Sequence, residues 1–290
     1  MSGNAEYKDR LFSFMFGNSE HKEWTLSLYN AVNGTSYDDP EQISIETIRQ
    51  VLYMGMHDDV AFIIADMLSL YEQQSTFNPN MPVRMLEYTA NLMEKYIRQN
   101  RLNKFSRRQI MLPVPKLVVF YNGVEDEPDE RTLSLSDAFK PEHRQDADIT
   151  VRVRMININR GRSEALMNTC RPLTEYAWIV DSIRRENRNT TLEAAIDRTI
   201  ERLPGDFLTK PFLEAHRAEV KNMLLTEYNE AETMALFKEE GRAEGRAEGT
   251  DMASLRSIRS LMRSMKLNAQ QAMDALGIPP DDQARYAEML

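Results

Sequence analysis

The sequence has very few of the residues from which disulfide frameworks and zinc sites are built. Its single cysteine, Cys170, excludes any disulfide within the chain. The four histidines, His21, His57, His143 and His216, are too dispersed to form a zinc motif. The chain also begins without the basic segment and apolar stretch of a signal peptide. These absences favour a protein of the reducing cytoplasm.

Long apolar runs are absent as well. The run in 116–123 is among the longest, and it is far shorter than the ~20 residues that cross a bilayer, so we expect no membrane span. Hydrophobic residues make up 42% and charged residues 28%, which is typical of a globular chain and not of a disordered one. The formal net charge of -9 argues against a protein that coats nucleic acid, although a local basic surface could still bind phosphates.

Apolar periodicity predicts alternating helices and strands in the first half of the chain. Segment 9–34 has apolar residues at helical spacing on both sides of Gly17, which predicts two helices. The apolar stretches 59–66 and 67–76 have the length of strands, and we expect them to form a hairpin around Asp66.

Three further elements and a loop follow. Segment 85–97 has apolar residues at i, i+3 and i+4 steps, which predicts a helix. The continuous apolar run at 112–123 ends in Asn-Gly and predicts a strand buried on both faces. An acidic loop at 125–130 precedes an alternating segment at 150–159, which predicts a half-exposed strand. This order is typical of an α/β protein with a sheet covered by helices.

The second half is predicted to be almost entirely helical from about residue 164. A Glu/Gly/Arg repeat interrupts it, and we interpret this repeat as a linker because each glycine costs about 1 kcal/mol inside a helix. The predicted divisions are therefore a core at 1–163, a helical region packed on it at 164–237, a linker at 238–250 and a small helical tail at 251–290.

The tail carries an apolar stripe that we expect to need a partner. A segment of this size is too short to bury such a stripe alone, and its partner could be the core of the same chain. The glycine-rich connection at 241–249 favours a separately placed unit, so the sequence predicts a homodimer that depends on the tail. The stripe consists of Leu255, Ile258, Leu261, Met262 and Met265.

Polar residues end one apolar strand and open its predicted neighbour. Side chains alternate along a strand, so Glu72 and Gln74 project from the same face, and Asp59 opens the preceding strand. Two carboxylates on neighbouring strands can hold Mg²⁺, which prefers oxygen ligands at about 2.0–2.1 Å. On spacing alone, however, charges exposed to solvent at the ends of strands are the better-supported interpretation.

A resemblance to a known family changes this weighting. The segment MGMHDDVAFIIADMLSLYEQQSTFNPNMPVRMLEY at 54–88 resembles the core of the Rpn family of recombination-promoting nucleases, also labelled putative transposases. In that family a strand opening with Asn-Asp leads into Glu-x-Gln-Ser-Thr and an Asn-Pro-Asn-Met-Pro turn. The resemblance extends to YNAVNGTSY (29–37), LPVPKLVVFYNG (112–123), LSLSDAF (133–139), NINRG (157–161) and PLTEYAWIV (172–180).

The family belongs to the PD-(D/E)XK nuclease superfamily. The resemblance implies a restriction-endonuclease-like mixed sheet flanked by helices, followed by a mostly helical C-terminal region. It implies that Asp59 and Glu72 are the two strand acids and metal ligands, with Asp9 of the first helix as a supplementary ligand. Gln74 stands where the generic motif has Lys, and since an amide offers only a dipole, more of the catalysis falls to the metal.

The function implied by the resemblance is a metal-dependent DNA endonuclease that hydrolyses phosphodiester bonds in recombination, mobile-element biology or defence against foreign DNA. Its cofactor would be Mg²⁺ or another divalent cation. A second interpretation stays open because of Gln74, namely a catalytically weakened DNA-binding or regulatory protein that oligomerises through its C-terminal helices.

Two basic groups could follow a DNA backbone, although a solvated charged face explains each of them equally well. The second group, at 152–162, follows the first in the chain and contains four arginines. The first group lies at 98–108, and we predict that it binds nucleic acid; it consists of Arg98, Arg101, Lys104, Arg107 and Arg108.

Overall fold

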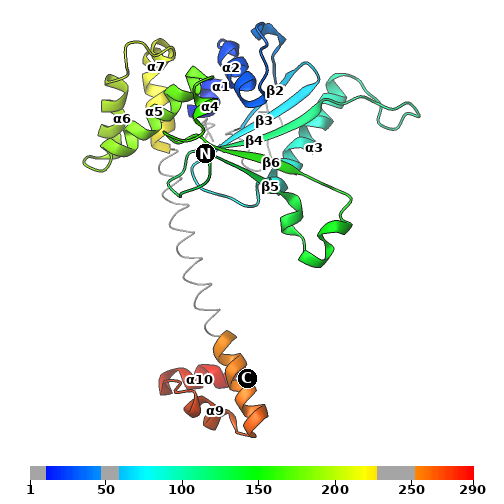
Figure 1. Cartoon of the computed structure of the whole chain (residues 1–290), viewed down its shortest axis with the longest axis vertical. Coiled ribbons are helices and arrows are strands. Elements are labelled where there is room, and N and C mark those ends of the chain that lie inside the picture. The colour runs from blue at the N-terminus through cyan, green and yellow to red at the C-terminus, as the bar shows by residue number, and fades with distance from the viewer. Residues whose placement is uncertain (1–10, 47–58, 227–251) are drawn as a thin grey trace, which may run out of the picture. The chain divides into compact units, whose positions relative to one another are not determined.

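The computed structural model describes residues 11–46, 59–226 and 252–290, and the chain divides into two compact units, Met1–Ala231 and Glu232–Leu290 (Figure 1). The predicted linker at 238–250 lies outside the described residues. Residues on both sides of the boundary predicted after 163 contribute to one hydrophobic core of the first unit.

The described part of the first unit starts with two helices, as predicted. Helix α1 spans Leu11–Phe16 and α2 spans Lys22–Asn33. Between them the amide of Gly17 donates to the Ser13 carbonyl. A Cβ atom at Gly17 would lie 2.7 Å from that oxygen, so the close approach that ends α1 requires glycine.

A mixed sheet of six strands forms the centre of the first unit, in the order β1-β2-β3-β4-β6-β5. Strands β3, β4 and β6 are parallel, whereas β2 and β5 run antiparallel to their neighbours. The strands are β1 (Ser44–Glu46), β2 (Asp59–Ile64), β3 (Met67–Gln74), β4 (Val114–Tyr121), β5 (Glu130–Ser134) and β6 (Arg152–Asn157).

This topology brings the ends of five strands together at one end of the sheet. Gln74, Tyr121 and Asn157 end the parallel strands, while Asp59 and Glu130 open the two antiparallel ones. In the strand register, Gln74 pairs with Tyr121, and Tyr121 pairs with Asn157. Asp59 pairs with a residue two positions from Gln74, and Glu130 pairs with the residue before Asn157. We call this end, at which the parallel strands finish, the carboxyl end of the sheet.

The predicted strands are found, with differences in burial. The hairpin of β2 and β3 turns at Ala65, whose φ is 49°, and at Asp66. Strand β4 is exposed along Val114–Lys116 and buried only from Val118 onward, so the prediction of burial along its whole length was wrong. Strand β5 was not predicted, because its sequence ERTLS lacks an apolar alternation and it lies at the edge of the sheet.

Helices cover both faces of the sheet, which is the predicted α/β arrangement (Figure 1). Helix α3 (Met81–Gln99) buries Met81, Met85 and Leu92 in one hydrophobic cluster with the inner residues of β3 and β4. On the other face, α1, α2 and α5 (Arg171–Glu186) form a second cluster around Tyr71.

The remaining elements of this unit are mostly helical, as predicted for the second half. Residues 217–226 are also helical. In the described part of the chain, no helix has the length and apolar character that a membrane span requires. The remaining helices are α4 (Glu164–Met167), α6 (Leu192–Glu201), α7 (Lys210–Ala215) and the short 3₁₀ helices Pro40–Gln42, Leu135–Ala138 and Pro141–Asp146.

The second unit contains a helical segment at 252–265, α9 (Ala269–Ala275) and α10 (Pro280–Met289). These helices have a small core of their own, in which Leu255 and Ile258 are buried. The expectation that the tail cannot bury its stripe was therefore wrong for these two residues, since α9 and α10 cover them.

A substitution pair tests whether this small core holds the tail together. Ile258→Ala should destabilise the unit by about 2–4 kcal/mol, because Ile258 is fully buried. Met265→Ala is the matched control and should change stability by less than about 0.5 kcal/mol, because Met265 is 63% exposed. Amide hydrogen exchange of 252–290 in the full chain measures both effects. Equal exchange rates in the two variants would contradict the arrangement.

Candidate functional site at the carboxyl end of the sheet

The strand register brings the two predicted acids to the same place. Asp59 is the first residue of β2 and lies directly opposite Glu72 of β3. Residues that face each other across antiparallel strands have Cβ atoms about 4.5–5.5 Å apart. Gln74 lies two residues further along β3, on the same face as Glu72. The third predicted acid, Asp9, lies outside the described residues.

Glu72 is a buried carboxylate whose partner comes from the chain itself. Its side chain is only 4% exposed, and its Oε1 atom lies 2.9 Å from Nη1 of Arg84. Gln74 Nε2 donates to the same oxygen at 3.1 Å. Because a buried carboxylate requires a cation or several hydrogen bonds, this contact explains how Glu72 is tolerated. Arg84 was not predicted as a site residue, since nothing in a helical pattern shows which strand residue a basic side chain will contact.

Arg84 lies in the first turn of α3 and connects the carboxylate to the surface. Its side chain is 36% exposed, so the guanidinium reaches solvent although Glu72 does not. The Nε and Nη2 atoms donate to the Tyr88 hydroxyl at 3.0 and 2.8 Å, which fixes the plane of the guanidinium. The result is an oriented positive charge at the outer side of Glu72.

Gln74 has a hydrogen-bonding capacity that the described residues do not use. The side chain is 6% exposed, and its Nε2 atom donates to Glu72 and contacts the Met81 sulfur. Its Oε1 atom is buried, and no hydrogen-bond donor among the described residues reaches it. Leaving a buried acceptor unsatisfied costs about 1–3 kcal/mol, so this oxygen is available to accept a hydrogen bond from a water molecule or a ligand.

A second polar network occupies the opposite face of the sheet at the same edge. Gln73 Nε2 donates to Asn122 Oδ1 at 2.7 Å, and Asn122 Nδ2 donates to the Tyr176 hydroxyl at 3.1 Å. Arg184 of α5 donates to the Asn122 carbonyl and, at 2.9 Å, to Asn159 Oδ1. This network was not predicted from the sequence, and it attaches α5 to the ends of β3 and β4.

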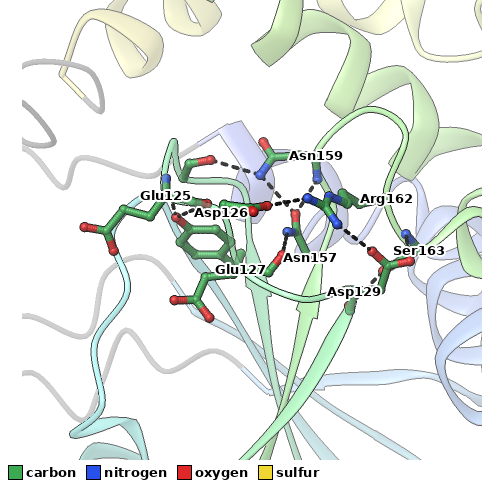
Figure 2. Close-up of polar contacts among 10 residues, drawn as sticks. Glu125, Asp126, Glu127, Asp129, Asn157, Asn159, Arg162 and Ser163 are labelled. Carbon is green, nitrogen blue, oxygen red and sulfur yellow. Dashed lines mark hydrogen bonds and ion pairs between the residues drawn. The ribbon is translucent and has the colours of Figure 1, made fainter.

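The predicted acidic loop is fastened over the ends of β4 and β6 (Figure 2). Asn157 Nδ2 donates to the Glu127 carbonyl at 2.7 Å. Arg162 forms ion pairs with Asp126 and, at 3.5 Å, with Asp129. Figure 2 shows the carboxylate of Glu127 pointing away from Arg162. The loop therefore has defined internal contacts, and its negative charge is partly compensated.

The predicted DNA-binding stretch lies far from this edge. Arg98, Arg101, Lys104, Arg107 and Arg108 are all exposed, and they connect the C-terminal end of α3 to the start of β4. Helix α3 begins near Gln74 and has 19 residues, which corresponds to about 28 Å at about 1.5 Å per residue. The structure therefore does not bring the stretch together with Glu72 and Gln74.

The second basic group is largely paired within the chain. Arg154 donates to both carboxylate oxygens of Glu130, at 2.6 and 2.7 Å, and this hydrogen bonding lowers the pKa of Glu130. Arg160 lies 3.4 Å from Asp181. The Arg154–Glu130 pair lines a pocket of about 740 Å³ between the ends of α2 and α4. These contacts indicate that the second basic group mainly stabilises the fold.

The strand register places the positions of the three predicted residues Asp59, Glu72 and Gln74 at one end of the sheet. Carboxylate and amide oxygens are the ligand types that suit Mg²⁺, so these residues stay the candidate ligands. Among the side chains that the structure describes, no cluster of three or more His, Cys, Asp or Glu residues could bind a metal.

Comparisons with known proteins give no assignment. No protein-family model, curated protein or solved structure matches this chain. The family relationship that the sequence motifs suggest therefore stays a prediction.

The interaction free energy between Arg84 and Glu72 can be measured by a double-mutant cycle. Arg84→Gln should cost more stability than Glu72→Gln, because it leaves a carboxylate buried, whereas Arg84 is partly hydrated when alone. We expect a coupling of about 1–2 kcal/mol, a value reduced for the exposure of Arg84.

Arg98→Gln, an exposed change in the last turn of the same helix, is the control. Urea unfolding of the single and double variants gives the coupling. Additive single effects would show that the two side chains do not interact in solution.

Proposed function

We propose that this chain is a metal-dependent DNA endonuclease of the Rpn branch of the PD-(D/E)XK nucleases. The observation that carries the proposal is the register of β2 and β3, in which Asp59 lies directly opposite Glu72 at the end of the sheet. An acid that opens one strand and a Glu-x-Gln that ends its neighbour is the pattern on which the family resemblance rests. The meeting of these residues at one edge supports the proposal.

In the proposed mechanism, Asp59 and Glu72 hold Mg²⁺ or another divalent cation. When bound, such an ion lowers the pKa of a coordinated water and shields the charge of the phosphate. The donor set suits a hard cation, since it consists of carboxylates and an amide. The unused acceptor Gln74 Oε1 fits the same site, because it can accept a hydrogen bond from a water molecule held there.

Arg84 compensates in this proposal for the lysine that the chain lacks. A lysine at position 74 would place a positive charge beside the reacting phosphate, and Gln74 cannot do this. The Arg84 guanidinium lies 2.9 Å from Glu72 and reaches solvent, so it is placed to meet a phosphate that approaches the site. Its planar fork of N–H donors is suited to phosphate oxygens.

One observation favours the alternative function. Arg84 already compensates the charge of Glu72, so the carboxylate is accommodated without a metal ion. This contact would also be expected in a catalytically weakened protein that binds DNA or regulates another process. A parent protein that binds duplex DNA but never cleaves it, with or without divalent cations, would establish this alternative.

A plasmid-nicking assay with and without Mg²⁺ tests the endonuclease proposal. Glu72→Gln and Asp59→Asn should each lower the cleavage rate by about 100-fold or more, because each removes a charged metal ligand while keeping the side-chain shape. Glu94→Gln is the control, since Glu94 lies on α3 away from the site and pairs with Lys104. Circular dichroism must show that all variants are folded. Parental nicking by both site variants would refute the assignment of these residues.

The division of work between Gln74 and Arg84 gives a further prediction. Arg84→Ala should lower kcat more than it weakens Mg²⁺ binding, and Arg84→Lys should recover part of the rate by restoring the charge. Gln74→Ala should also slow cleavage, whereas Gln74→Lys restores the generic motif and should retain activity. Single-turnover rates across a Mg²⁺ titration separate the two effects. An unchanged rate in Arg84→Ala would remove this residue from the mechanism.

The homodimer also stays a prediction. Leu255 and Ile258 are covered within the tail, which leaves fewer apolar residues for a partner than the sequence suggested. Met265 and Leu276 are still exposed and could contribute to an interface. Light scattering of the full chain and of a chain ending at Glu240 should give a dimer and a monomer. Two equal monomeric masses would contradict dimerisation through the tail.

A further inference from the structure

A pocket of about 290 Å³ lies between α5 and α6, and three arginines from the two helices line it. Arg185 belongs to α5, whereas Arg198 and Arg202 belong to α6 and its end. We infer that this pocket binds phosphate groups of a DNA backbone. The identification of the ligand as DNA rests on the proposed function, whereas the anionic chemistry rests on the pocket itself.

The charges of the pocket favour an anion. Glu186 is the acidic residue of its lining, and it pairs with Arg198 at 3.5 Å and Arg202 at 2.9 Å. Arg185 pairs with Asp181 at 3.2 Å. The three arginine side chains are still 51–68% exposed, so N–H donors of each guanidinium face solvent. Exposed ion pairs of this kind are weak, and a phosphate can therefore share or replace them.

Two further lining residues indicate a ligand. Thr199 is 1% exposed, and its Oγ1 atom is buried without a hydrogen-bond partner among the described residues. The hydroxyl of a threonine in a helix can donate to a backbone carbonyl of the preceding turn. The Thr199 hydroxyl makes no such bond, so it is available at this pocket both to donate and to accept a hydrogen bond. Trp178 also lines the pocket, where it packs edge-on against Phe207, and its indole is a fluorescent reporter beside the three arginines.

The position of the pocket distinguishes it from the basic stretch predicted from the sequence. Arg184 donates to the Asn122 carbonyl and to Asn159, both at the carboxyl end of the sheet. Arg185, the next residue of α5, points about 100° away around the helix and lines the pocket. The pocket therefore lies on the α5 side of the sheet, and Glu72 and Gln74 lie on the opposite, α3 face. In the proposal, the backbone of a bound duplex passes beside α5 and α6.

Binding of a fluorescein-labelled duplex in EDTA tests the inference without any cleavage. The double variant Arg198→Gln/Arg202→Gln should bind at least about 10-fold more weakly than the parent. Its plot of log K against log salt should also be flatter by about 1–2, since each lost phosphate contact contributes about 0.9. The matched control Arg256→Gln/Arg263→Gln removes the same charge from exposed positions of the second unit, outside any proposed binding surface, and should bind like the parent. Equal losses in both double variants, or a loss in the control alone, would overturn the inference.

A second variant separates ligand binding from folding. Thr199→Val keeps the shape of the side chain and removes the unsatisfied hydroxyl, so thermal stability should be equal or higher while DNA affinity falls a few-fold. Parental affinity in both Thr199→Val and Arg198→Gln/Arg202→Gln would overturn the inference even if the parent cleaves DNA. Conversely, DNA binding that depends on the pocket would support it even if the parent never cleaves.

Trp178 fluorescence distinguishes a DNA backbone from a free anion. Titration with duplex DNA should change the emission at micromolar concentrations, and Trp178→Phe, which leaves Trp24, should abolish the change. Inorganic phosphate and a mononucleotide should act only at millimolar concentrations. Saturation by either small anion at micromolar concentrations without any response to DNA would assign the pocket to a free phosphate ligand and overturn the proposal.

Discussion

The parallel pairing of β3, β4 and β6 is the constraint on which the rest of this structure depends. Because these three strands run in the same direction, they end together, and the antiparallel β2 and β5 begin at the same edge. Polar residues that are far apart in the sequence, such as Asp59, Gln74 and Asn157, therefore meet at one end of the sheet. In open α/β sheets, this end is where ligands usually bind.

Buried polar side chains at this end of the sheet are stabilised by partners from the chain, and the partners differ between the two faces of β3. On the α3 face, Glu72 is compensated by the charge of Arg84. On the α5 face, Gln73 Nε2 donates into a neutral chain of amide and hydroxyl groups that leads to Tyr176. The neutral network is suited to fixing the position of α5, whereas the charged face retains the groups that could bind a cation or a phosphate.

The distribution of arginine bears on the proposal that this acidic protein binds DNA. The net charge is -9, so attraction to phosphate must come from local surfaces. Arginines of β6 and the following turn are held by Glu130, Asp126 and Asp129. The exposed guanidiniums of α5 and α6 lie on the α5 side of the sheet, and the basic stretch after α3 lies at the other end of the strands, before β4. Position in the fold, more than the density of charge in the sequence, separates these groups.

The sequence by itself determined the local elements and the pattern of the candidate residues. Periodicity predicted α1, α2, α3, the hairpin of β2 and β3, and the strands β4 and β6, because apolar spacing depends directly on which face of each element is buried. It also put Glu72 and Gln74 on one face of a strand, since alternation is a property of the strand alone.

Only the tertiary structure decided which side chains meet. The contact of Glu72 with Arg84, the network from Gln73 to Arg184 and the pocket of α5 and α6 join residues that no local pattern relates. The apolar stripe of the tail is a further example. Its spacing predicted that one face of the helix is buried, but it did not predict that α9 and α10 bury Ile258. Periodicity specifies the face that must be buried, and the packing of the whole chain selects the partner that buries it.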